Sequence, residues 1–189
     1  MKSSSAVDDD TAAVGRLTPA QCATLYFDWP IWARDEQLPP PGDWVTWLLL
    51  GGRGAGKTRA GAEWVRRLAT EGIGPIALVG ETITEAIAVM VLGESGLLAV
   101  TPPAERPKLS GAALHWPNGV VGTILGAADP ERFRGPQFAA AWCDEVAKWP
   151  NAEPAIDGKA AASTRYSKMK PAVFDAVEMN AVIGVGAPW

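Results

Sequence analysis

The sequence has few of the residues that mark disulfide-rich, metal-binding or membrane proteins. Its 189 residues include two cysteines and one histidine, too few for a disulfide framework or a metal knuckle. We therefore expect Cys22 and Cys143 to be reduced thiols and His115 to be an ordinary strand residue. No uncharged apolar run reaches the roughly 18 to 20 residues of a membrane span. Residues 1–15 also lack the apolar core of a secretory signal, so a cytoplasmic protein is expected.

An excess of basic residues is also lacking. The chain has 17 Lys and Arg against 21 Asp and Glu, which gives a formal net charge of -4. This balance argues against an extensive nucleic-acid-binding face but leaves a local one open. Nine tryptophans follow no fixed spacing, which is typical of core packing rather than of a base-stacking platform.

The order of predicted elements indicates an α/β fold. Short apolar runs at residues 45–50, 75–80 and 138–143 read as buried strands, and the run at 45–50 is apolar on both faces. A helix follows the first strand and ends near Gly72, with Arg59 and Glu63 at i,i+4 spacing on the face opposite its apolar stripe. A capping box at residues 82–85 begins another helix, and residues 112–125 form a hairpin. Strands that alternate with helices predict a mainly parallel sheet flanked by helices.

A glycine-rich loop follows the first predicted strand. Residues 51–58, "GGRGAGKT", satisfy the pattern G-x-x-x-x-G-K-[ST] between an apolar strand and an amphipathic helix. Glycines let successive backbone N–H groups surround phosphate oxygens, and the following helix adds its positive end. Lys57 would bind the β and γ phosphates, and Thr58 would bind Mg²⁺. The predicted nucleotide-binding set is Gly51, Gly52, Arg53, Gly54, Ala55, Gly56, Lys57 and Thr58, with a nucleotide and Mg²⁺ as ligands.

Two acids come directly after the third buried strand. Asp144 at this strand end can hold Mg²⁺, and Glu145 can polarise the attacking water. The adjacent glutamate favours a hydrolase over a nucleotide kinase. Hydrolysis also needs an arginine near the γ-phosphate. Arg53, Arg132 and Arg134 are the candidates, and the residues alone do not decide between them.

The chain resembles the large terminase subunit of tailed bacteriophages, prophages and gene transfer agents. The resemblance rests on these motifs together with the segments "FDWPIWARDEQLPPPGDW", "LHWPNG" and "PERFRGPQFAAAWCDEVAKW". The resemblance implies an ASCE-type P-loop NTPase, with an added strand between the two Walker strands. It also implies that Gln37 lies near the adenine, that Asp144 holds Mg²⁺ and Glu145 activates water, and that Arg53 is the loop arginine. Arg134 is the best candidate for an arginine presented to a neighbouring subunit.

The resemblance also implies a domain organisation and partners. We expect a flexible arm at 1–25, the ATPase domain at 26–150, and an atypical tail at 151–189 without the nuclease domain of terminases, as a truncation or frameshift near Pro154 would produce. Double-stranded DNA, a portal protein, the small terminase subunit and a homo-oligomeric ring are the implied partners, in the cytoplasm of a bacterial host. The alternatives are an inactive remnant that binds nucleotide without turnover, and another P-loop translocase or helicase.

Overall fold

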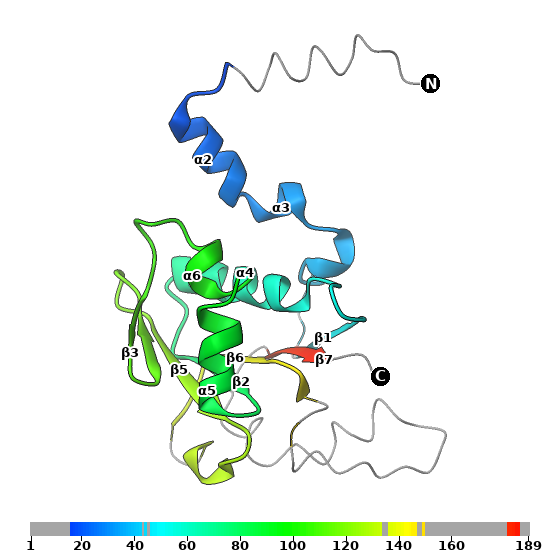
Figure 1. The fold of residues 1–189 in the computed structure, drawn as a ribbon, viewed down its shortest axis with the longest axis vertical. Helices are drawn as coiled ribbons and strands as arrows, with labels where there is room; N and C mark the ends of the chain where they lie inside the picture. The colour runs from blue at the N-terminus through cyan, green and yellow to red at the C-terminus, as the bar shows by residue number, and fades with distance from the viewer. Residues whose placement is uncertain are drawn as a thin grey trace.

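The computed structural model describes residues 16–42, 44, 46–133, 136–146, 149 and 181–185. These residues form one sheet with helices packed against it (Figure 1). Its strands follow the order β1-β7-β6-β2-β5-β4-β3. The first five strands pair in parallel, and β4 pairs antiparallel with both of its neighbours, β5 and β3. The strands are β1 (Thr46–Leu50), β2 (Ile76–Gly80), β3 (Lys108–Ser110), β4 (Ala113–His115), β5 (Val121–Gly126), β6 (Ala140–Cys143) and β7 (Ala181–Val185). The predicted α/β fold with a mainly parallel sheet is confirmed.

Strand β7 lies between β1 and β6 and pairs with both in parallel. Thr46 stands opposite Ala181, and Leu50 stands opposite Val185. One strand therefore separates the strand before the glycine loop from the strand before the acidic pair, as the family resemblance implies. Sequence periodicity leaves this segment unplaced, because its short run of small and β-branched residues has no distinctive pattern.

The core occupies both faces of the sheet. In β2 every residue is buried, with Ile76 and Leu78 in the apolar cluster under the long helix and Ala77 and Val79 in the cluster on the other face. Strand β1 departs from the prediction of burial on both faces. Trp47 and Leu49 are buried beneath the helix, but Leu50 is 63% exposed. The reason is that β1 is the last strand of the described sheet and its covered face is the one that carries Trp47 and Leu49.

The helices agree with the predicted start and stop signals. Gly72 has φ 77° and follows the long helix, where its N–H donates to the Ala69 carbonyl. The Thr82 side chain accepts a hydrogen bond from the Glu85 N–H and begins the next helix. The helical elements are α2 (Pro19–Phe27), α3 (Trp29–Trp32), the 3₁₀ turns η1 (Asp35–Gln37) and η3 (Pro130–Phe133), α4 (Lys57–Thr70), α5 (Ile83–Ala86), the π-helix η2 (Ile87–Val91) and α6 (Leu97–Val100). Within the part of the chain that is described, no helix is long and apolar enough to cross a membrane.

Helix α2 overlaps the predicted flexible arm, because residues 19–25 are helical. Thr18 caps the helix by accepting from the Gln21 N–H, while the Gln21 side chain accepts from the Thr18 N–H. Pro19 occupies the first helical position, where its missing N–H has no cost. The capping box "TPAQ" is the local sequence signal for this helix.

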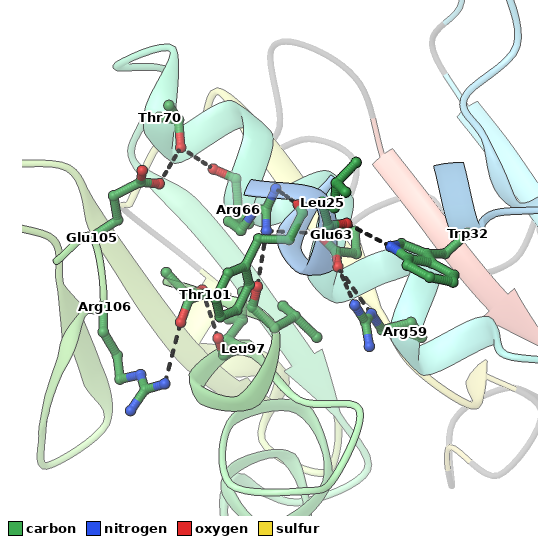
Figure 2. A network of polar contacts seen from close by, with 12 residues as sticks. Leu25, Trp32, Arg59, Glu63, Arg66, Thr70, Leu97, Thr101, Glu105 and Arg106 are labelled. Carbon is green, nitrogen blue, oxygen red and sulfur yellow. Dashed lines mark hydrogen bonds and ion pairs between the residues drawn. The ribbon is translucent and has the colours of Figure 1, made fainter. Parts of the chain in front are cut away.

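Helix α4 carries a buried carboxylate on the face that points away from the sheet (Figure 2). Glu63 is only 3% exposed. One carboxylate oxygen, Oε1, accepts from Arg59 at 2.7 Å, and the other, Oε2, lies 3.3 Å from Arg66. Burial raises the pKa of Glu63 above its ordinary value of 4.5, while the charges of Arg66 and Arg59 act in the opposite direction.

The same two arginines hold neighbouring segments against α4. The Arg66 guanidinium donates to the carbonyl oxygens of Phe27 at 2.8 Å and Val100 at 2.9 Å. The Arg59 guanidinium lies 5.1 Å from the ring centre of Trp29. The helix that follows the glycine loop is therefore fixed on two sides, by the sheet below and by the segment around residues 27–29 above.

Candidate functional site

The glycine loop connects the carboxyl end of β1 to the first turn of α4. Its turn is closed by the Ala55 N–H, which donates to the Gly52 carbonyl at 3.2 Å. Gly54 and Gly56 have φ values of 77° and 76°, in the left-handed region that other residues rarely adopt. Gly56 is also the N-cap of α4, so the first N–H groups of a 14-residue helix face the loop. This arrangement supplies the backbone donors that a phosphate group requires.

Lys57 and Thr58 lie at the start of α4. The Lys57 ammonium donates to the carbonyl oxygens of Gly51 and Gly52 at 2.8 and 2.9 Å, so its charge lies over the loop. Thr58 is half-buried and contributes to the wall of the same cleft as Asp144. The cation and the hydroxyl that the sequence motif predicts are thus both at the cleft.

The acidic pair follows β6 at the same edge of the sheet. Asp144 is 6% exposed, and its backbone N–H donates to the Val79 carbonyl of β2 at 2.9 Å. Its carbonyl accepts from the indole N–H of Trp149 at 3.2 Å. Burial and the adjacent Asp144 carboxylate raise the pKa of the Cys143 thiol to about 12. The backbone of Asp144 is therefore fixed at the end of β6, and its side chain lies in a poorly solvated site.

Glu145 departs from the strand geometry. Its φ is 46°, in the left-handed region where a residue other than glycine is strained. Such strain in a folded protein clusters at functional sites, where the surrounding structure enforces it. Glu145 lines the cleft together with Asp144.

The glycine loop, the first turn of α4 and the acidic pair line one cleft of about 460 Å³. A smaller cavity of about 160 Å³ shares Thr58, Val89, Asp144 and Glu145 with it. The larger volume is in the range of sites for small molecules, about 300–1,000 Å³. The tertiary structure thus brings together two motifs that lie far apart in the sequence.

The opposite wall of the cleft consists of residues that the sequence motifs do not predict. They follow β2 and include the π-helix η2, a local geometry that occurs mostly at functional sites. Those that line the cleft are Ala88, Val89, Gly93, Glu94 and Ser95. Those that line the smaller cavity are Glu81, Glu85, Ala86, Val89 and Met90. The signal that could have found them is topological, because parallel strands end at one edge and the segment after β2 must lie beside those after β1 and β6.

The donors present fit a magnesium ion that is shared with a nucleotide. Thr58 and Asp144 offer hydroxyl and carboxylate oxygens to one cavity, and oxygen is the ligand that Mg²⁺ prefers. The described residues contain no group of three or more His, Cys, Asp or Glu side chains that could hold a metal ion. Mg²⁺ is usually held by one or two protein ligands together with phosphate oxygens and water.

The candidate arginines have different positions. Arg53 is exposed and lies on the wall of the cleft. Arg132 is also exposed and pairs with Asp129 at 2.9 Å. Arg134 lies outside the described residues.

Gln37, which the resemblance implies to be near the adenine, is buried against the glycine loop. Only 5% of the residue is exposed. The amide nitrogen Nε2 donates to the carbonyl oxygens of Ala55 and Gly56, both at 3.4 Å. The amide nitrogen of Gln37 therefore contacts the backbone of the loop.

The family model of the terminase large subunit, T4-like virus type, N-terminal, matches residues 48–174. The chain belongs to this family. The match covers both the glycine loop and the acidic pair, and it continues past residue 151, where the predicted atypical tail begins. Curated protein sequences give no match.

Solved structures of large terminases have a similar fold. A large terminase from a thermophilic bacteriophage has a TM-score of 0.51 and 16% sequence identity, over 85% of this chain and 37% of that one. The large terminase ATPase domain of Thermus phage P74-26 has a TM-score of 0.47 and 16% identity, over 85% of this chain and 64% of that one. The terminase chain described here therefore spans less than two thirds of either structure.

Proposed function

We propose that this chain binds ATP with Mg²⁺ and hydrolyses it, as the ATPase module of a viral DNA-packaging motor. The observation that carries the proposal is the shared cleft, in which the glycine loop, Lys57 and Thr58 face Asp144 and Glu145. Family membership supports the link to packaging. The cleft by itself supports ATP hydrolysis but not DNA packaging, and family membership by itself supports a role in packaging but does not locate the ATP site.

Each side chain has a distinct role in this proposal. The loop N–H groups and the first turn of α4 bind the phosphates, and Lys57 leaves the loop carbonyls to pair with the β and γ phosphate oxygens. Thr58 and Asp144 hold the metal, and bound Mg²⁺ would neutralise charge that develops on the phosphate oxygens. Glu145 orients the attacking water and accepts its proton as the bond to the γ-phosphorus forms and the bond to the bridging oxygen breaks.

An arginine completes the charge stabilisation in this scheme. Arg53 is the candidate within the chain, since it lies on the cleft wall. Arg134 is the candidate for a neighbouring subunit of a homo-oligomeric ring. By family membership, double-stranded DNA, a portal protein and the small terminase subunit are the proposed partners.

The test measures binding and turnover separately. Binding of a fluorescent ATP analogue with Mg²⁺ should be lost in Lys57→Ala, because the motif's lysine is the cation that pairs with the β and γ phosphates. Phosphate release should fall at least about a hundredfold in Glu145→Gln while binding persists, since only the activation of water is removed. Unchanged affinity in Lys57→Ala would refute nucleotide binding at this loop.

Matched controls separate these effects from general changes of charge. Lys108→Ala removes an exposed lysine on β3, and Glu71→Gln alters an exposed carboxylate beyond the far end of α4. Both variants should bind and hydrolyse ATP as the unaltered chain does. Tight binding with background phosphate release in the unaltered chain would instead favour a nucleotide-binding protein without turnover.

A further inference from the structure

The structure assigns Gln37 to a second role: we infer that it is a positioning residue that fixes the phosphate loop through the carbonyl oxygens of Ala55 and Gly56. This inference rests on the proposed function and deepens it. It differs from the reading of adenine that the family resemblance implies. The contacts of Gln37, of its neighbour Arg34 and of Gly56 carry the argument.

The amide of Gln37 is held in one orientation. Its oxygen Oε1 accepts from the backbone N–H of Arg34 at 3.1 Å, which directs the nitrogen Nε2 toward the loop. Nε2 then donates to the carbonyls of Ala55 and Gly56. The Gly56 carbonyl also accepts the first hydrogen bond of α4, from the Ala60 N–H at 3.0 Å. One side chain thus touches the two peptide groups that precede Lys57.

A second contact comes from the same turn. The Arg34 guanidinium donates to the Ala55 carbonyl at 2.8 Å, so this oxygen receives hydrogen bonds from two side chains. Carbonyls that are held from behind constrain the peptide planes to which they belong, and with them the directions of the adjacent N–H groups. Those N–H groups are the proposed phosphate donors.

The fit between Gln37 and the loop leaves no free space. A Cβ atom added to Gly56 would collide with Nε2 of Gln37, in addition to the unfavourable φ of 76°. The φ of Gly56 therefore favours glycine at this position, and the Gln37 amide occupies the space where a Cβ would lie. Such complementarity is expected of a built contact rather than of a side chain that waits for a base.

The turn itself is anchored along α4. The chain that leads to it is fixed by Arg66 at the Phe27 carbonyl and by Arg59 at the Trp29 ring. From Phe27 to Gln37 the segment therefore contacts α4 and the loop at three successive places. Figure 1 shows this segment running beside α4 before the chain enters β1.

The test compares ligands that share the phosphates but not the base. The affinities of ATP, GTP and inorganic triphosphate are measured by their displacement of a fluorescent ATP analogue. The measurement is made on the unaltered chain, on Gln37→Ala and on Gln37→Glu. Gln37→Ala should weaken all three ligands about three- to tenfold. Gln37→Glu keeps the shape but places carboxylate oxygens against the two carbonyls, so the loss should exceed about tenfold. The ratio between ATP and triphosphate should stay within about twofold.

Two further variants keep the result interpretable. Glu36→Gln alters an exposed side chain on the same turn and should bind all three ligands normally. Arg34→Ala removes the guanidinium that donates to the Ala55 carbonyl, so it should fold normally and weaken all three ligands by a similar factor. If the variants at Gln37 have lowered thermal stability, the affinities of Arg34→Ala test the positioning role instead.

The outcomes separate this inference from the proposed function. If Lys57→Ala loses binding but the variants at Gln37 and Arg34 bind all ligands normally, the positioning role is wrong and the nucleotide site stands. If Gln37→Ala weakens ATP and leaves triphosphate unchanged, the side chain reads the base. If the unaltered chain binds none of the three ligands, both proposals fail.

Discussion

Removal of the Glu63 carboxylate should destabilise the fold through loss of a buried charge network. Glu63→Ala deletes two hydrogen bonds from Arg59, at 2.9 and 2.7 Å, and the ion pair with Arg66 at 3.3 Å. Hydrogen bonds to charged groups contribute about 1.5–3 kcal/mol each, and breaking a buried ion pair costs about 3–5 kcal/mol. The arginine side chains are 27% and 17% exposed, so water partly compensates them. We expect a loss of about 2–3 kcal/mol, below the full cost of a buried pair.

Unfolding in urea, followed by tryptophan fluorescence, measures this loss. For a chain of this size, each kcal/mol lowers Tm by about 2–4 °C, so Tm should fall by about 4–12 °C. Glu71→Ala is the matched control beside the same helix, because Glu71 is 51% exposed and pairs with Arg67, which is 53% exposed. Its effect should stay within about 0.5 kcal/mol. A loss below about 1 kcal/mol in Glu63→Ala, or equal losses in both variants, would refute the reasoning.

Three other predictions concern buried groups. The pKa of Glu63 is raised above 4.5, so the folded chain takes up this proton at higher pH than the unfolded chain. Its stability relative to Glu63→Gln should therefore rise as the pH falls from neutral toward 4.5, as urea titrations would detect. Gly61→Ala should cost about 1–3 kcal/mol, although alanine favours helices, because its Cβ collides with the Trp142 indole; a gain in Tm would contradict this packing. Iodoacetamide at about pH 8 should modify exposed Cys22 but not buried Cys143, whose pKa is about 12, until the chain is unfolded; mass spectrometry distinguishes one adduct from two.

Local sequence patterns predict the elements that hold the site. Strand β2, helix α4 and its end at Gly72 follow from apolar periodicity and a glycine stop, and these signals need no tertiary information. The N-cap at Thr82 and the hairpin of β4 and β5 are local in the same sense. These predictions are confirmed. Each could be made from the sequence because it depends on interactions within a few residues.

Other features depend on which segments meet. The burial of Glu63 follows from the segment around Phe27 and Trp29 covering α4, whereas the sequence shows only an i,i+4 pair on the second face of the helix. The place of β7 follows from long-range pairing with β1 and β6. Backbone pairing between distant strands leaves no periodic signal in a five-residue run.

The sequence by itself determined the glycine loop between a strand and a helix, since the pattern of glycines, a lysine and a threonine is local. It also determined that the acids Asp144 and Glu145 end a buried strand. The tertiary structure decided that the two motifs line one cleft, that residues after β2 form its opposite wall, and that Gln37 contacts the backbone of the loop. The physical reason is that parallel strands bring their carboxyl ends to one edge, and only the strand order sets which loops meet there.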